Sequence, residues 1–572
     1  MKKFVNRSAD VVEEMLEGLS VLQPGTVRLL GHKVLLRADA QRDPDWQVSV
    51  ISGGGSGHEP AHAGYVGAGM LSAAVAGEVF TSPSSDSVFA AIKAVSGKPG
   101  ALLVVKNYTG DRLNFGLAAE MARAEGIPVE MVVVNDDVAL KRTGPATGAR
   151  GLAGTVFIHK LVGAAAAEGR NLAEAAAAGW AAVESLASMG VSFSAGTSPA
   201  VGKPSFELGE DEMELGLGIH GEPGVRRTQI QSANQITETL LNEIITLGKF
   251  DGDRRVAVMI NNLGATTQME MAIIARHAVP SLETKGFTVE RIYAGTFLSS
   301  LDMAGISISV LGVDDERLHW LDAPTTAPAW PNAPRHPPGK AETGIVTDIS
   351  TKAASRSGAG AETDSGRRLK RAIEAASNAL IEAEPELTEL DRITGDGDLG
   401  ISLKRAAEAV RQSLDFYPLD NIPATLKALG HTLRREMGGA SGPLYGVLFL
   451  RCGNVLESSA TPEAKTDMRA WANALDQGCR AISELGGAKP GDRTMLDALD
   501  PFAQALKASK AEPREALLAA ADAAARGAEA TAYMKPRLGR SSYLGERVLG
   551  HPDPGAKAVA IWLRAAIHAL SD

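Results

Sequence analysis

Three aspartates and three glycines fall within residues 391–400, a stretch that reads Asp-Arg-Ile-Thr-Gly-Asp-Gly-Asp-Leu-Gly. Glycines let the backbone turn sharply and approach a ligand closely, while the like charges of Asp391, Asp396 and Asp398 repel one another unless a cation lies between them. Such hard oxygen ligands suit Mg²⁺ that also holds substrate phosphates. The stretch therefore predicts a metal site for phosphoryl transfer. A solvated acidic turn is the alternative, because Asp-Gly pairs are common turn residues.

A second chemical segment, Ser-Gly-Gly-Gly-Ser-Gly-His-Glu-Pro at residues 52–60, directly follows an apolar run that predicts a strand. It does not fit a dinucleotide fingerprint, because the position three residues after Gly55 is His58 rather than glycine. His58 and His62 have the spacing of a zinc-protease motif, but Pro60 interrupts the helix that this motif requires. We expect a helix to begin near Pro60 and His58 to lie in a glycine loop that binds a small polar ligand.

Two further segments carry polar side chains among small residues. Lys106 and Asp111 follow another predicted strand, where the amine can bind an oxygen and the carboxylate can accept a proton; a turn with a surface ion pair is the alternative. His220 lies among four glycines and a proline in residues 216–224. Neutral imidazole is a nucleophile toward carbonyl carbon, so this open histidine is a candidate for covalent chemistry.

Composition restricts the class of protein. The chain has 572 residues, 44% apolar and 22% charged, which predicts a globular protein of two to four domains. A formal net charge of −10 argues against an extended nucleic-acid surface. The two cysteines provide no disulfide framework, and we find neither a signal peptide nor an apolar stretch long enough for a membrane span. We therefore expect a cytoplasmic enzyme without a membrane or nucleic-acid partner.

The elements that must position these residues divide at a segment rich in proline and then in small polar residues, near residues 324–366. We predict a domain at 1–330 with lobes of about 1–190 and 191–330, a linker at 331–366 and a domain at 367–572. Short β-branched runs that end in polar loops predict an α/β fold for the first domain. The second domain is rich in Ala, Leu, Glu, Arg and Lys, which predicts an all-helical fold.

Taken together, the ordered motifs resemble the single-chain, ATP-dependent dihydroxyacetone kinases over nearly the whole chain. In the first half the resemblance depends on residues 52–60, 106–111 and 218–224. In the second half it depends on residues 395–398, 438–442, 490–495, 539–543 and 553–556. The resemblance implies a two-lobed α/β domain that binds the ketone and a barrel of antiparallel helices that binds ATP.

The resemblance also implies roles for individual residues. His220 matches the histidine that adds to the ketone carbonyl as a hemiaminal, Asp111 matches the general base on the hydroxyl, and His58 matches the residue that orients or shares that proton. Gly55 and Lys106 match hydrogen-bond donors to the substrate.

In the second half, Asp391, Asp396 and Asp398 match the ligands of two Mg²⁺ ions that bridge the phosphates of ATP. The remaining nucleotide-binding candidates come from the other matching motifs and are Gly438, Gly439, Ser441, Gly442, Asp492, Arg493, Thr494, Arg540, Asp553 and Gly555. Leu399, Ala440 and Pro443 depart from side chains that relatives often carry.

Several functions remain open at this stage. The leading prediction is a kinase for dihydroxyacetone, and a kinase for erythrulose by the same mechanism is the first alternative. A different phosphate donor, an FMN-cyclising lyase and a regulatory ligand-binding protein are the others. The resemblance further implies a homodimer in which the nucleotide domain of one chain faces the ketone domain of the other.

Overall fold

The computed structural model describes residues 3–141, 149–199, 202–204, 206–222, 224–250, 254–332, 363–437, 439–458 and 467–571, apart from the side chains of Arg540 and Tyr543. The chain forms two compact units, residues 1–343 and residues 344–572. Each unit has its own hydrophobic core. The predicted linker falls almost entirely outside the described residues, and the first helix of the second unit already begins at Asp364.

The first unit contains two six-stranded mixed sheets, whose strand orders are β1-β2-β4-β3-β5-β6 and β11-β10-β12-β7-β8-β9. The strands are β1 Thr26–Arg28, β2 Val34–Arg37, β3 Ser49–Ser56, β4 Ala73–Val79, β5 Ala101–Lys106, β6 Val129–Val134, β7 Leu186–Ser192, β8 Glu212–Leu215, β9 Arg226–Gln229, β10 Arg255–Asn262, β11 Thr288–Gly295 and β12 Gly305–Gly312. The helices are α1 Val11–Leu22, α2 Ala38–Arg42, η1 Ala63–Tyr65, α3 Ser85–Val95, α4 Thr109–Ala124, α5 Thr155–Ala167, α6 Leu172–Glu184, α7 Ala233–Leu247, α8 Gln268–Thr284 and α9 Asp315–Asp322.

The alternation of side chains along the central strands determines the layers of this unit. In β5, Leu102 and Val104 pack into a core shared with α5, α6 and α9, whereas Leu103 and Val105 pack on the opposite face against α3 and α4. The second sheet likewise separates the shared core from a core built with α7 and α8. Both faces of each sheet are therefore covered, which explains why these strands read as continuous apolar runs.

Two local expectations for this unit are wrong. The glycines at 53–55 are not a loop but the end of β3, where a Cβ on Gly53 would lie 2.2 Å from the carbonyl oxygen of Val75 on the next strand. No α-helix begins at Pro60; a turn leads instead into the short η1 helix. The second sheet includes β7, which spans the predicted lobe boundary near residue 190.

The regular elements of the second unit are all helices among its described residues, and the predicted fold class is confirmed. Its helices are α10 Asp364–Glu382, α11 Glu384–Thr394, α12 Leu399–Ser413, η2 Leu414–Phe416, α13 Ile422–Glu436, α14 Ser441–Glu457, α15 Met468–Gly486, α16 Leu496–Ala508, α17 Pro513–Ala530, η4 Thr531–Tyr533, η5 Arg540–Tyr543, η6 Gly545–Val548 and α18 Pro554–Ser571. Among the described helices of the whole chain, none combines the length and apolar character that crossing a membrane requires.

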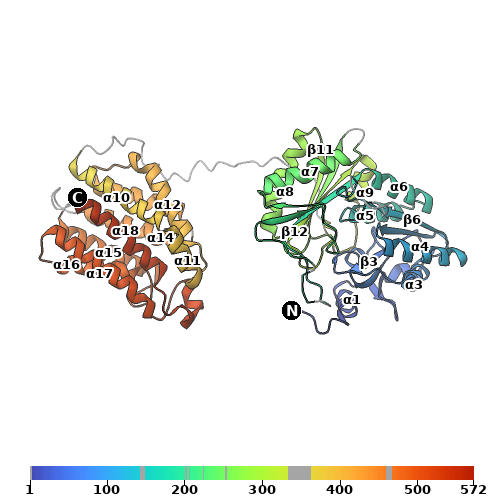
Figure 1. The fold of residues 1–572 in the computed structure, drawn as a ribbon, viewed down its shortest axis with the longest axis horizontal. Helices are drawn as coiled ribbons and strands as arrows, with labels where there is room; N and C mark the ends of the chain where they lie inside the picture. The colour runs from blue at the N-terminus through green and yellow to red at the C-terminus, as the bar shows by residue number, and fades with distance from the viewer. Residues whose placement is uncertain are drawn as a thin grey trace. The chain divides into compact units, whose positions relative to one another are not determined.

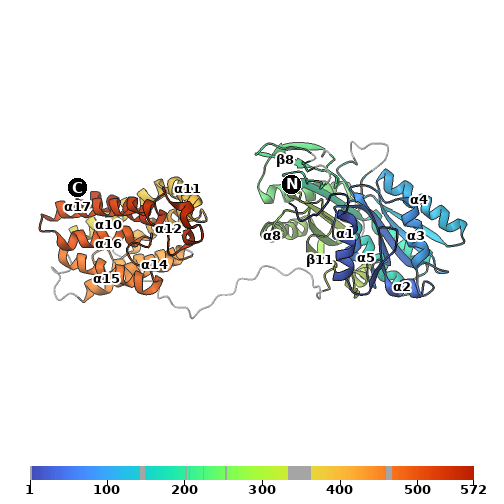
Figure 2. The same ribbon diagram turned by 90° about the horizontal axis from the view of Figure 1, so that it is seen from below.

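The long helices of the second unit form a closed ring. Successive helices from α12 to α18 contact one another, and α10 closes the ring between α18 and α12 (Figure 1, Figure 2). The ring encloses an apolar cavity of about 850 Å³, lined by side chains that include Phe449, Trp471 and Trp562. None of the three clustered aspartates lines this cavity, so the candidate metal site is a separate feature at the ends of helices.

Candidate active site

The first polar site lies where parallel strands of the first sheet end. Strands β3 and β5 are parallel neighbours, and the carboxyl ends of such strands are the usual position of a ligand site. His58 follows β3, Lys106 is the last residue of β5, and Asp111 lies in the first turn of α4. The order of the strands therefore brings together side chains that the sequence places in separate motifs.

His220 approaches this strand end from the second lobe. Its ring packs edge-on against the rings of His58, at 4.8 Å between centroids, and of Tyr108, at 4.5 Å. Nδ1 lies 3.1 Å from Oε1 of Glu222, and the backbone N–H of His220 donates to Oε2 of the same carboxylate at 2.9 Å. Both oxygens of Glu222 are thus committed to one histidine, which holds the loop and the ring in one orientation.

The charge of Glu222 fixes the tautomer of that histidine. Burial by itself would raise the pKa of Glu222, but hydrogen bonds and the charge of His220 outweigh burial and lower the pKa to about 2. An ionised carboxylate only accepts hydrogen bonds. Nδ1 of His220 therefore donates to this carboxylate, and in the neutral ring Nε2 carries the lone pair that a nucleophile needs.

His58 is buried and neutral. Its Nδ1 lies 2.8 Å from the carbonyl oxygen of Ser299, which can only accept, so Nδ1 carries the proton. Burial lowers the pKa of His58 well below its usual range, and the nearby His220 and Lys106 lower it further. Nε2 is buried without a hydrogen-bond partner among the described residues. In the neutral ring this nitrogen is a hydrogen-bond acceptor.

Lys106 and Asp111 form the charged part of the site. Nζ of Lys106 lies 3.8 Å from Oδ2 of Asp111, and both side chains are buried. The other carboxylate oxygen of Asp111 accepts a hydrogen bond from Oγ of Ser82 at 2.5 Å. Burial lowers the pKa of Lys106, and Asp111 opposes that effect. A buried ammonium beside a buried carboxylate can orient a substrate hydroxyl and accept its proton.

Glycines leave the space that this arrangement occupies. A Cβ on Gly54 would lie 2.4 Å from Nζ of Lys106, and a Cβ on Gly55 would lie 2.6 Å from the backbone nitrogen of Thr81. Each glycine therefore permits an approach that no other residue allows at that position. The role of Gly55 as a donor to the substrate stays a prediction.

Sequence reasoning missed three contributors to this site. Phe80 stacks on His58 at 5.1 Å and meets His220 edge-on at 5.5 Å, and no motif marks it. Tyr108 lies within the segment at residues 106–111, yet its contact with His220 depends on the packing of two lobes. Glu222 stands two residues after His220, so this short spacing of an acid and a histidine was the one available signal.

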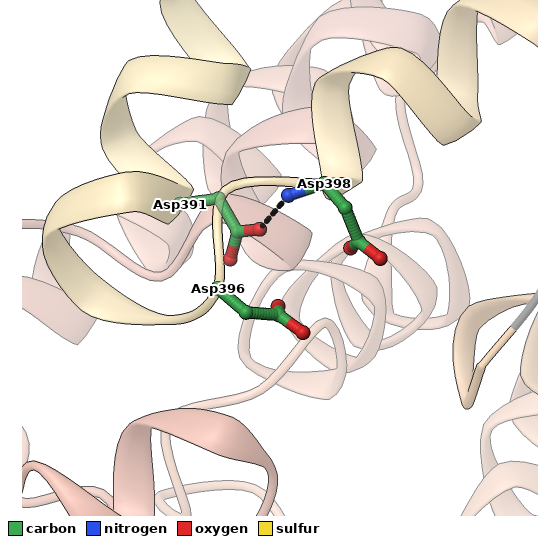
Figure 3. A group of neighbouring side chains, drawn as sticks. All are labelled: Asp391, Asp396 and Asp398. Carbon is green, nitrogen blue, oxygen red and sulfur yellow. Dashed lines mark hydrogen bonds between the residues drawn. The ribbon is translucent and has the colours of Figure 1, made fainter. Parts of the chain in front are cut away.

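The second polar site lies between α11 and α12, where the ligand atoms of Asp391, Asp396 and Asp398 all lie within 4.8 Å of one another (Figure 3). Oδ2 of the buried Asp391 accepts backbone hydrogen bonds from Asp398 at 3.0 Å and Leu399 at 3.1 Å. Burial raises the pKa of Asp391, and the charges of Asp396 and Asp398 add to this effect. The donor set fits a hard divalent cation, because it offers only oxygen ligands that repel one another without one.

Asp553 connects this turn with the motif at 490–495. Burial raises the pKa of Asp553 to about 6; the charges of Asp497 and Asp391 add to this effect, and Arg493 opposes it. Arg493 is buried at a φ of 64°, and its guanidinium donates to the carbonyl oxygens of Thr531 and His551 while one terminal nitrogen has no partner among the described residues. Charged side chains from the stretch at 391–400 and from the region of the 490–495 motif therefore influence the pKa of Asp553.

The other nucleotide-binding candidates have local structural contacts. Asp492 accepts the backbone N–H of Lys489, and Thr494 donates its own N–H to Asp497. Gly555 lies in the first turn of α18. Gly439 precedes α14, and Ser441 and Gly442 lie in its first turn, which has no side-chain cap hydrogen bond. Gly438 and the side chain of Arg540 lie outside the described part of the chain.

Comparisons with known proteins agree along the whole chain. Residues 17–329 match the Dak1 domain, and residues 393–568 match the DAK2 domain. A human protein named triokinase/FMN cyclase is 44% identical over 582 residues, covering 100% of this chain and 99% of that protein. The L-erythrulose 1-kinase of Mycolicibacterium smegmatis is 35% identical over 574 residues, covering 99% of each.

A solved structure extends the likeness to the fold. The crystal structure of the dihydroxyacetone kinase from C. freundii in complex with AMP-PNP and Mg²⁺ matches with a TM-score of 0.63 at 34% sequence identity. The match covers 99% of this chain and 99% of that chain.

Proposed function

The chain belongs to the dihydroxyacetone kinase family, and we propose that it transfers the γ-phosphoryl group of ATP to a terminal hydroxyl of a short-chain ketose, with dihydroxyacetone as the first candidate. The observation that carries this proposal is the pairing of His220 with Glu222 beside the buried Lys106 and Asp111. One side presents a nucleophilic nitrogen to a carbonyl group, and the other presents a base to a hydroxyl.

The ketone is held on His220 as a hemiaminal. The lone pair of Nε2 adds to the carbonyl carbon, the π electrons move to the carbonyl oxygen, and that oxygen takes up a proton from the medium. The ring acquires a positive charge, which the ionised Glu222 at 3.1 Å offsets. Glycerol has no carbonyl group, so it is rejected by chemistry as well as by shape.

The held ketone presents its terminal hydroxyl to Asp111. The carboxylate takes the hydroxyl proton, the oxygen forms a bond with the γ-phosphorus, and the bond from that phosphorus to the bridging oxygen breaks to release ADP. His58 accepts a hydrogen bond through its unpartnered Nε2, and Lys106 neutralises charge beside the base. Positioning and electrostatics supply most of the catalysis in such transfers.

Asp391, Asp396 and Asp398 would hold Mg²⁺, for which two ions are predicted. Bound Mg²⁺ would neutralise the charge that develops on the phosphates. The candidates at the start of α14, with Asp492, Arg493, Thr494, Arg540, Asp553 and Gly555, would position the nucleotide around these aspartates.

The test is ADP release with Mg-ATP across dihydroxyacetone, glyceraldehyde, both erythrulose enantiomers and glycerol, with a His220→Ala chain as control. The proposal is supported if the wild-type chain turns over ketoses but not glycerol and the His220→Ala chain turns over neither. No turnover of any ketose, or equal turnover of glycerol, refutes capture on His220.

Two narrower functions have specific support in the names of relatives. A relative named L-erythrulose 1-kinase favours the four-carbon ketose as an alternative substrate, and the same assay ranks it against dihydroxyacetone. The human relative named triokinase/FMN cyclase favours a second, lyase activity. Consumption of FAD with Mn²⁺ and ATP-free enzyme, followed by chromatography of the flavin products, tests that activity.

The homodimer with active sites shared between chains remains part of the proposal. A His220→Ala chain lacks the ketone nucleophile, and an Asp396→Ala chain lacks a metal ligand. Mixing them should restore part of the activity if each site draws on two chains. No recovery in mixtures shown to contain mixed dimers would contradict the shared site.

A further inference from the structure

A row of buried polar side chains extends from Lys106 into the core of the first lobe. Nε2 of His62 lies 2.9 Å from Nζ of Lys106, and Nδ1 of His62 lies 3.3 Å from Oγ of Ser52. Nε2 of His159 lies 3.1 Å from the same Oγ. All four side chains are buried, and buried polar groups are costly unless their hydrogen bonds are satisfied.

One carbonyl group determines the direction of every hydrogen bond in this row. Oγ of Ser52 lies 2.7 Å from the carbonyl oxygen of Val104, which can only accept, so the hydroxyl proton points there. Ser52 must then accept from both histidines. His62 therefore carries its proton on Nδ1, and its Nε2 presents a lone pair to Lys106. Burial lowers the pKa of His62 well below its usual range, and Lys106 adds to this effect, so the ring stays neutral.

The position of Lys106 follows from this acceptor. Its ammonium donates to His62 at 2.9 Å but stays 3.8 Å from Oδ2 of Asp111, beyond the usual length of a charge-assisted hydrogen bond of about 2.8 Å. A buried lysine with a carboxylate as its only partner would close that distance. His62 offers a competing acceptor on the other side and so keeps the ammonium from forming a tight ion pair with Asp111.

We propose that His62 is a positioning residue for the phosphoryl acceptor: it holds Lys106 apart from Asp111, so that the carboxylate remains a base strong enough to take the substrate proton. Ser52, whose hydroxyl donates to the carbonyl oxygen of Val104, fixes the tautomer of His62 that makes this possible. The inference rests on the proposed function, because it assigns a base role to Asp111.

Several titratable groups surround Lys106 and Asp111. Among the described residues, the charge of Lys106 acts on His58 and His62 from the turn after β3 and on His159 from α5, and the charge of Asp111 acts on Tyr108 before α4. Burial lowers the pKa of His159 to about 3 and raises the pKa of Tyr108 well above its usual range. Neither of these two changes charge in the working range, so a change in the pH profile after substitution of His62 reports on Lys106 and Asp111.

The test compares His62→Leu, His62→Gln and Ser52→Ala with the wild-type chain, using kcat and KM for the ketose, KM for ATP and the pH profile of kcat. His62→Leu removes the acceptor, and we expect kcat to fall about 10- to 100-fold and its acidic limb to move to lower pH, because a tight ion pair weakens the base. His62→Gln keeps an oxygen acceptor and should recover most of the loss. KM for ATP should not change. His277→Leu, on α8 in the second lobe, is the control for losing a histidine from this unit.

The outcomes separate this inference from the function on which it rests. Absence of ketose turnover by the wild-type chain refutes the proposed function. Active wild-type enzyme with an unchanged pH profile and kcat in folded His62→Leu overturns the role of His62 alone. If His62→Leu does not fold, Ser52→Ala decides: a smaller fall in kcat with the same shift of the acidic limb is expected, and an unchanged profile overturns the inference.

Discussion

The cluster of Asp391, Asp396 and Asp398 should oppose stability and support function at once, and Asp396→Asn separates the two effects. The ligand atoms lie within 4.8 Å of one another. Two unit charges at that distance repel by about 0.9 kcal/mol in water and by about 3.5 kcal/mol at an effective dielectric constant of 20. Asp396 and Asp398 are exposed, so the lower value applies, and salt reduces it further.

The substitution should therefore stabilise the second unit in the absence of metal by about 1 kcal/mol at low salt. For a domain of this size, that corresponds to a rise in Tm of about 2–4 °C. The same change removes one of three anionic ligands, so the affinity for Mg²⁺ should fall at least about tenfold, which is a loss of about 1.4 kcal/mol.

The assay is thermal unfolding of the full chain at low salt with AMP-PNP, with and without saturating Mg²⁺. The wild type should gain stability from Mg²⁺, and Asp396→Asn should start higher and gain less. Asp522→Asn is the matched control, since it removes the same charge from an exposed position on α17 that pairs with Arg564 outside the cluster. A lower metal-free Tm together with a normal response to Mg²⁺ in Asp396→Asn would refute the reasoning.

Three further predictions concern the first unit. Gly54→Ala should lower kcat/KM for the ketose by about 30- to 100-fold, since its Cβ displaces the Lys106 ammonium from a buried hydrogen bond; Gly116→Ala, whose Cβ meets open space on α4, is the control and should not lower activity. Glu222→Gln should lower kcat/KM about tenfold without changing KM for ATP, because a neutral partner no longer offsets the charge on the adduct; steady-state kinetics that leave both values unchanged contradict this role. His159 has a pKa of about 3 in the folded chain and binds protons more readily when unfolded, so this group should destabilise the chain as the pH falls below 6.5. The loss from this group is about 2 kcal/mol at pH 5. Urea denaturation of the wild type and of His159→Leu at pH 7.5 and 5 checks it, because the difference between the two chains excludes groups such as Asp553, and an equal change in both chains contradicts the prediction.

Local patterns in the sequence were sufficient for many of the elements and for the proximity of the three aspartates. The apolar runs at Ala101–Lys106, Val129–Val134 and Arg255–Asn262 form strands. A strand that is buried on both faces needs apolar residues at nearly every position, so it is visible in the sequence as a continuous apolar run. The three aspartates meet because Asp391 lies in the last turn of α11 while Asp396 and Asp398 lie in the short connection to α12, so their proximity follows from their closeness along the chain. The order of the motifs was likewise enough to identify the family.

Only the tertiary structure decided what surrounds each catalytic candidate. His58 and His220 belong to different lobes, and their rings meet because the lobes pack over a shared core. The glycines at 53–55 lie in a strand rather than in a loop, and neighbouring groups fill the space that a side chain would need there. Lys106 could have formed a surface ion pair by its sequence, but in the structure it is buried between His62 and Asp111. Sequence determines which groups are present and how far along the chain they lie, whereas partners, burial and tautomers depend on contacts between segments that the chain brings together only when it folds.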